Sequence, residues 1–151
     1  MSTWPRIAVG AVVLRDDDKI LLIKRKYPPS PNLWSIPGGH IEEGEPVLVA
    51  LFRELEEETS LKASKATLLA ITEYIRLRKD YSVKYHYVIL DYLITDAEGE
   101  PVANEESLGI GFFRFNDALK LELTDTTKEL IRLIMSEGIN KVKHIINIVY
   151  E

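Results

Sequence analysis

The sequence predicts an α+β fold, in which helices pack against a mixed β-sheet. Three observations support this fold class: two short apolar segments near the N-terminus that flank an acidic turn, two longer β-branched and aromatic segments in mid-chain, and two segments with helical periodicity. At 151 residues the chain has the typical length of one domain, so we expect residues 1–151 to form a single domain.

The N-terminal part is predicted to hold extended segments joined by turns. Residues 7–14 and 19–24 are rich in aliphatic side chains on either side of a turn at 16–18, which indicates a hairpin. Three prolines within 27–32 predict a loop, because proline cannot donate to a strand ladder. Residues 33–36 then form a short extended piece that ends at a Pro-Gly-Gly sequence.

A helix is predicted over 45–59, where no glycine interrupts the chain and a proline suits the first turn. Strands are expected over 67–77, 82–95 and 109–115, which are β-branched and aromatic.

The C-terminal part is predicted to begin with a short helical turn capped by Asn116 or Asp117. Residues 124–136 have the periodicity of an amphipathic helix. The apolar tail, 139–150, could cover the core or pair with a second subunit, so a homodimer is one expectation.

Composition excludes several classes of protein. The net charge of -5 and pI of about 5.3 argue against non-specific binding to nucleic acid or to an anionic membrane. With no cysteine, there is no disulfide, cysteine–zinc site or cysteine nucleophile. We see neither a signal peptide nor a membrane span, so we expect a cytoplasmic protein.

The acidic end of the 45–59 helix carries the chemistry. At about 100° per residue, Glu54, Glu57 and Glu58 fall within a sector of roughly 100°. The apolar residues expected to dock this helix on the sheet are Leu48, Leu51, Phe52 and Leu55. Neighbouring carboxylates repel one another and oppose the helix dipole. A divalent cation would offset both effects, and hard oxygen ligands suit Mg²⁺. The alternative is a solvated acidic face.

The residues around this helix decide between those two interpretations. They read Gly39, five residues, Glu45, seven residues, and then Arg53-Glu54-Leu55-Glu56-Glu57-Glu58-Thr59-Ser60-Leu61. This pattern of 23 residues resembles the Nudix box, and LWSIPGG before it and YHYVILDYL after it resemble Nudix proteins too. One position departs, because the family has a glycine where this chain has Ser60. A serine can adopt the left-handed conformation there at a cost on the order of 1 kcal/mol.

The resemblance implies a Nudix-like α/β/α sandwich with a loop–helix–loop metal site. Glu54, Glu57 and Glu58 would bind Mg²⁺, with Mn²⁺ as an alternative, and the carbonyl of Gly38 would add another oxygen. The same carboxylates would be catalytic, because the metal neutralises a diphosphate and lowers the pKa of the attacking water.

Further catalytic roles follow from the same resemblance. Arg53 would orient a neighbouring carboxylate, with Glu45 as its partner. Glu105 and Glu106 are candidates for the general base, although two solvated loop acids are an equal alternative. Some relatives carry an acid just before the aromatic residue of the next strand, but here that stretch is 108–111, Leu-Gly-Ile-Gly, so the base is unassigned.

Candidate substrate-binding residues are Arg25, Tyr27, Trp34 and Gly39. Arg25 could meet a phosphate at the end of a strand, or be an exposed strand-end charge. Tyr27 and Trp34 could stack on a base, although aromatic residues in such places more often serve packing.

The resemblance is strongest to the ADP-ribose pyrophosphatase branch. It implies hydrolysis of a nucleoside diphosphate linked to another group, first of all ADP-ribose to AMP and ribose 5-phosphate. The alternatives are a (d)NTP pyrophosphatase that sanitises the nucleotide pool, a dinucleoside polyphosphate hydrolase, and a regulatory domain that binds nucleotide without turnover. The expected partner is thus a small nucleoside diphosphate derivative, with no membrane and no specific nucleic acid.

Overall fold

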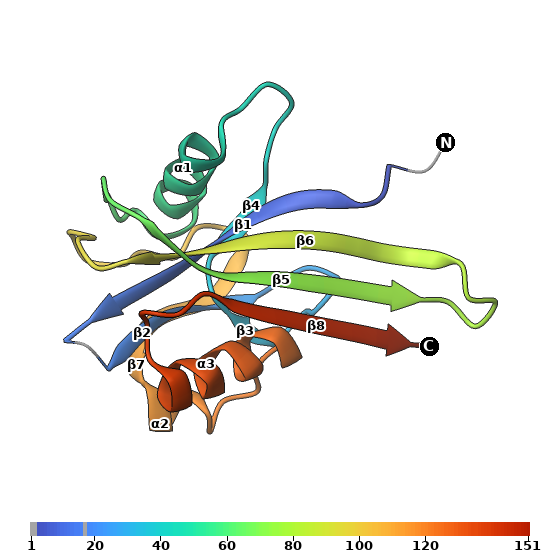
Figure 1. Cartoon of the computed structure of the whole chain (residues 1–151). Helices are drawn as coiled ribbons and strands as arrows, with labels where there is room; N and C mark the ends of the chain where they lie inside the picture. The colour runs from blue at the N-terminus through green and yellow to red at the C-terminus, as the bar shows by residue number, and fades with distance from the viewer. Residues whose placement is uncertain (1–2, 17) are drawn as a thin grey trace.

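The computed structural model describes residues 3–16 and 18–151. The described residues form a curled mixed sheet with helices on both sides, which confirms the predicted α+β class and its α/β/α layering (Figure 1). The elements, in chain order, are β1 (Arg6–Arg15), β2 (Lys19–Arg25), β3 (Trp34–Ser35), β4 (Gly38–His40), α1 (Val47–Thr59), β5 (Thr67–Leu77), β6 (Val83–Ile94), β7 (Ser107–Arg114), α2 (Phe115–Ala118), α3 (Asp125–Glu137) and β8 (Lys143–Tyr150).

Strand β1 organises the sheet, since it pairs with three other strands. It runs parallel to β6 along most of its length, antiparallel to β4, and antiparallel to β2 at its end. Strand order along the main path is β3-β2-β1-β6-β5-β8, and β7 pairs with β2. Gly10 of β1 therefore has Gly38 of β4 on one side and Asp91 of β6 on the other.

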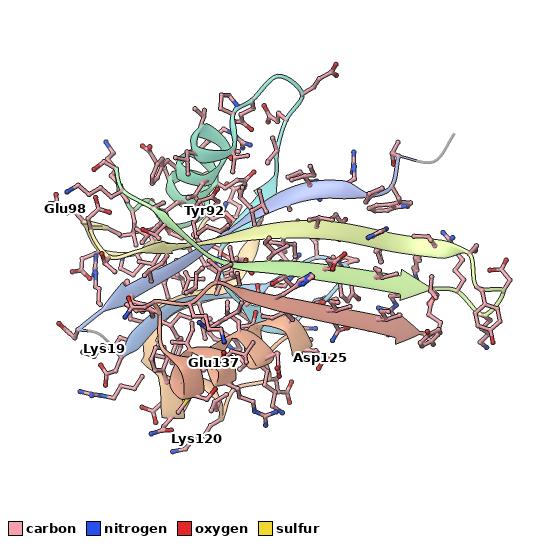
Figure 2. The ribbon with its side chains drawn as sticks, in the orientation of Figure 1. Lys19, Tyr92, Glu98, Lys120, Asp125 and Glu137 are labelled. Carbon is pink, nitrogen blue, oxygen red and sulfur yellow. The ribbon has the colours of Figure 1, made fainter. Side chains whose placement is uncertain are left out.

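Two apolar clusters hold the helices on opposite faces of the sheet. One packs α1 against β1 and β2, and the other packs α3 against the second face. In Figure 2, Tyr92 lies on the α1 side of the sheet, whereas Asp125 and Glu137 mark the two ends of α3 on the other side. Leu51 and Leu55 are fully buried under α1, as predicted, but Leu48 is 43% exposed, so its predicted docking role is wrong.

Helix boundaries differ from the predicted ones for local reasons. Helix α1 begins at Val47 because Pro46 is extended, with φ -63° and ψ 150°, so Glu45 lies before the helix. Thr124 caps α3 by accepting a hydrogen bond from the Thr127 N–H. The prediction of a cap for α2 at Asn116 or Asp117 is wrong, since Arg114 precedes this four-residue helix.

The tail contributes the last strand of the sheet. Strand β8 pairs in parallel with β5 from Ala70↔Lys143 to Leu77↔Tyr150. Ile145 is 4% exposed and belongs to the core cluster under α3. The structure therefore shows that the tail, residues 139–150, contributes to covering the core, which was one of the two roles considered for it. Its contribution to a dimer, and the organisation of residues 1–151 as a single domain, stay predictions.

None of the helices in the described parts of the chain is long and apolar enough to cross a membrane.

Candidate active site

Arg53 is the centre of the charged network at the acidic end of α1. Its Nε and Nη2 donate to the two oxygens of Glu45, over 2.7 and 2.9 Å. Its Nη1 donates to Glu54 (2.9 Å) and Glu57 (3.2 Å), and Nη2 also donates to the His40 carbonyl (3.2 Å). The hydrogen bond from Arg53 holds the pKa of Glu45 at about 2. The predicted contact of Arg53 with neighbouring carboxylates is present, including the one with Glu45.

Two carboxylates of α1 face strand β4. The Gly38 N–H donates to Glu58 Oε2 over 3.0 Å, and burial raises the pKa of Glu58 to about 8. Glu54 lies directly against Gly39, where a Cβ atom would overlap its carboxylate. Burial also raises the pKa of Glu54. Both groups therefore lack sufficient compensating positive charge in this arrangement.

Two further predicted residues act electrostatically on Glu58. The positive charge of Arg25 lowers the pKa of Glu58, whereas the negative charge of Glu106 raises it. Arg25 Nε is buried and has no hydrogen-bond partner within the described chain. Arg25 and Glu106, which come from two other segments of the chain, are thus close enough for their charges to act on Glu58.

The turn that carries Glu105 and Glu106 is tied to α1 by Asn104, a residue that sequence reasoning missed. Asn104 Nδ2 donates to the Glu57 carbonyl (3.2 Å), and Asn104 Oδ1 accepts from the Glu106 N–H (2.9 Å). Lys26 Nζ donates to the Glu105 carbonyl (3.4 Å). Both acidic side chains are exposed. An asparagine ahead of a turn is the local signal that could have pointed to this role.

The acidic residues fit a hard divalent cation in their chemistry. Glu54 and Glu58 have raised pKa values that a nearby cation would lower, and carboxylate oxygens are the donors that Mg²⁺ prefers. They do not form a finished ligand set, because Arg53 donates to both Glu54 and Glu57. Accordingly, no three His, Cys, Asp or Glu side chains of the described chain are grouped as metal ligands. For Gly38 the observed contact is its N–H, and ligation by its carbonyl stays a prediction.

A cavity of about 600 Å³ opens beside these groups. Its lining includes Arg25, Gly38 and Gly39 at the charged end, and continues along β5, β6 and the start of α3. Tyr27 and Trp34 are absent from the lining that the described residues provide. Trp34 instead packs edge-on against Phe113, at 5.2 Å between ring centroids, and belongs to the periphery of the core. Tyr27 is 53% exposed.

The deep end of the cavity contains two polar residues that sequence reasoning missed. Thr72 and Asp91 are each 2% exposed, and Thr72 Oγ1 donates to Asp91 Oδ2 over 2.6 Å. The signal was the one acidic residue in the otherwise apolar and aromatic segment YHYVILDYL. The lining of the cavity thus includes both Arg25, beside the β4 glycines that contact the α1 carboxylates, and the buried Thr72–Asp91 pair. The volume of the cavity falls in the range of small-molecule sites.

Comparison with known proteins agrees with this geometry. A NUDIX domain model matches residues 4–134. An ADP-ribose pyrophosphatase of Methanocaldococcus jannaschii is 33% identical over 117 residues, covering 78% of this chain and 66% of that protein. An RNA pyrophosphohydrolase of Pelagibacter ubique is 47% identical over 57 residues, or 38% of this chain and 35% of that protein. The matched segments thus span less than two thirds of the length of these curated relatives.

A solved structure supports the same assignment. The MutT NUDIX hydrolase from Burkholderia pseudomallei is 37% identical, with a TM-score of 0.75, and the match covers 85% of this chain and 96% of that one. The family model, the curated relative and the solved structure therefore agree with one another. The chain belongs to the Nudix hydrolase family.

Proposed function

We propose that the protein hydrolyses the diphosphate bond of a nucleoside diphosphate derivative, and that ADP-ribose is its first substrate, giving AMP and ribose 5-phosphate. The observation that carries this proposal is a cavity of about 600 Å³ whose lining includes Gly38 and Gly39, the two β4 residues that contact Glu58 and Glu54 of α1. The carboxylates suit a metal-bound diphosphate, and the cavity has room for a nucleoside. The choice of ADP-ribose is supported by the name of the Methanocaldococcus jannaschii relative.

The residues divide the work along the cavity. Glu54, Glu57 and Glu58 would hold Mg²⁺, or Mn²⁺, which when bound neutralises the diphosphate and favours deprotonation of water. Arg53 restrains Glu54 and Glu57, since it donates to both. Arg25, at the charged end of the cavity, would meet a phosphate oxygen.

Hydrolysis needs an attacking water and a proton acceptor. The water oxygen forms a bond to one phosphorus, the bond from that phosphorus to the bridging oxygen breaks, and the water's proton passes to a base. We assign that base to Glu106 rather than Glu105, because the charge of Glu106 acts on the Glu58 carboxyl. Asn104 holds the backbone of Glu106 in place.

A second candidate function is release of pyrophosphate from a nucleoside triphosphate. It is favoured by the RNA pyrophosphohydrolase relative, which has the higher identity over a shorter segment. The same charged groups would serve it, because both reactions are hydrolysis of a phosphoanhydride.

The test is turnover with Mg²⁺ on ADP-ribose, nucleoside triphosphates, dinucleoside polyphosphates and nucleotide sugars, with products separated by chromatography. Glu58→Gln removes one expected ligand and keeps the side-chain size. Because a catalytic metal stabilises the transition state by several kcal/mol, we expect kcat/KM for ADP-ribose to fall about 100- to 1000-fold. Glu56→Gln is the matched control, since Glu56 is exposed and its ion pair is a 3.9 Å contact with Lys62.

Three results would contradict parts of this proposal. Pyrophosphate release from triphosphates with no AMP from ADP-ribose would replace the substrate. Equal loss in Glu58→Gln and Glu56→Gln would remove the metal site from the explanation. Nucleotide binding without turnover of any compound would identify a regulatory domain.

A further inference from the structure

The buried pair formed by Thr72 and Asp91 is not used by the proposed chemistry. The two residues lie on neighbouring strands, β5 and β6, and both line the cavity. Asp91 Oδ1 lies over Gly10 of β1, where a Cβ atom would overlap it. A glycine at this position therefore leaves the space that the carboxyl group occupies.

Core packing does not account for a carboxyl group at this position. Asp91 is a buried charged residue, 2% exposed, on a strand whose neighbours along the chain are apolar or aromatic. Burial raises its pKa to about 7, the hydrogen bond from Thr72 partly opposes this, and no basic side chain of the described chain acts on it. An apolar residue would avoid the desolvation penalty of a buried carboxyl group with so little compensation. We therefore infer that the carboxyl group of Asp91 binds a ligand that enters the cavity.

The location fits the nucleobase of a bound nucleotide. Gly10 separates Asp91 from Gly38 in the sheet, so two strand spacings, about 10 Å in all, lie between the pair and the charged end. The lining of the cavity also includes Tyr87, which lies on β6 with Asp91 and stacks with His40 at 5.2 Å and 17°. Tyr74 and Ile89 add further aromatic and apolar surface. Aromatic and apolar surfaces of this kind pack against the flat ring of a nucleobase, and the Thr72–Asp91 pair lines the same cavity.

We propose that the Thr72–Asp91 pair determines base specificity, with Asp91 accepting a hydrogen bond from the exocyclic amino group of adenine. Thr72 donates to Asp91 Oδ2, which leaves Oδ1, the oxygen that lies over Gly10, to accept from the base. The amino group is the hydrogen-bond donor on the ring edge of adenine, and a carboxyl oxygen is its complement. This inference rests on the proposed function, since it requires an adenine nucleotide in the cavity.

The first test uses the unaltered protein and two substrates, ADP-ribose and its analogue with hydrogen in place of the amino group. Loss of a hydrogen bond to a buried carboxyl group should lower kcat/KM for the analogue about 10- to 100-fold. Equal kcat/KM values would overturn the proposal.

The second test removes the pair together. Thr72→Val with Asp91→Val replaces both polar partners by apolar groups, a change that is often neutral for stability or stabilising. We expect the ratio of kcat/KM values for the two substrates to fall to about 1 in this variant. Asp91→Asn keeps an acceptor oxygen and should retain most of the preference. A double variant that loses activity equally on both substrates, with the ratio unchanged, would show a structural role and overturn the proposal.

A binding experiment separates this proposal from the proposed function. Calorimetry would compare AMP with purine riboside 5′-monophosphate, for the unaltered protein and the double variant. Tighter binding of AMP that disappears in the variant would support base recognition even if ADP-ribose is not hydrolysed, in which case only the proposed function fails. Equal binding of the two monophosphates, or binding of neither, would overturn the base-specific role.

Discussion

Glu45, just before α1, and Glu58, in its last turn, are the same type of side chain in opposite electrostatic situations. Glu45 receives two hydrogen bonds from Arg53, and its pKa is about 2. Glu58 is buried against β4 with one backbone N–H as its hydrogen-bond donor, and its pKa is about 8. The first position has its cation built in as an arginine. Under the proposed function, the second position would take its cation from solution. The difference teaches that the charge partner, and not the type of side chain, decides how a carboxyl group in this network titrates.

The largest expected effect is on protein stability at high pH, when Glu58→Gln removes the negative charge of this side chain. The folded-state pKa of about 8 lies above the ordinary value of 4.5, so the folded chain binds this proton more tightly than the unfolded chain. Without divalent cations, that stabilisation is complete below pH 4.5 and is lost as pH rises to about 8. We expect Glu58→Gln to be the more stable protein at pH 9, by on the order of a few kcal/mol.

The measurement is urea denaturation at pH 5 and pH 9 in a chelating buffer. Glu45→Gln provides the opposite case, because the depressed pKa of Glu45 stabilises the fold above pH 4.5 and this contribution is lost as pH falls to about 2. If Glu58→Gln lost stability between pH 5 and 9 as steeply as the unaltered chain, the contrast between the two carboxyl groups would be wrong.

A smaller effect, on kcat/KM, is expected from Arg53→Lys, which weakens the hydrogen bonds from Arg53 to its carboxylate partners. Lysine in Arg53→Lys keeps the charge, but it cannot donate to Glu45, Glu54 and Glu57 from a rigid planar group. Since residues that orient metal ligands typically contribute about 10- to 100-fold to activity, we expect a loss of that size in kcat/KM. Metal titration by calorimetry should show weaker Mg²⁺ binding as well. Unchanged activity and affinity would show that the arginine network is not needed for positioning.

The smallest expected effect concerns the end of the helix next to Glu58. Ser60 has φ 66° and ψ 4°, the left-handed conformation anticipated from the departure in the motif, and its N–H donates to the Glu56 carbonyl. Glycine adopts this conformation without strain, so Ser60→Gly should stabilise the protein by about 1 kcal/mol. Thermal denaturation would measure the gain. Ser64→Gly is the contrasting case, because Ser64 has no positive φ and its Oγ donates to Asp96 over 3.0 Å, so this variant should lose stability. A stability loss in Ser60→Gly would contradict the assignment.

Local patterns predicted the elements that depend on local physics. The β5 and β6 strands and the left-handed Ser60 follow from side-chain type and from helix-capping rules. Thr124 was predicted to lie within a helix, whereas the structure shows it as the N-cap of α3. Strand β4 was not predicted, because Gly38 and Gly39 carry no side-chain pattern and pair only through their backbones. The partner of the tail was equally inaccessible, since parallel pairing with β5 joins distant segments.

In the candidate site too, the features set by local spacing were predicted, whereas those set by tertiary contacts were not. Spacing along one helix predicted that Glu54, Glu57 and Glu58 share a sector. It did not predict that Arg53 would hold two of its carboxylate neighbours, or that Trp34 would pack against Phe113. Asp91 was visible as an acid in an apolar strand, but only the tertiary structure places it against Thr72 and in a cavity.

The position of β1 has a consequence for the order in which the protein assembles. The contact of Gly38 in β4 with Glu58 in α1 joins segments that are close in sequence, whereas Gly10 and Asp91 meet only when β1 pairs with β6. Contacts between distant segments require closure of a long loop before they contribute stability, and so they tend to form late. We therefore expect the contact between α1 and β4 to form first, and the contact of Asp91 with Gly10 to form only when the distant strands β1 and β6 pair.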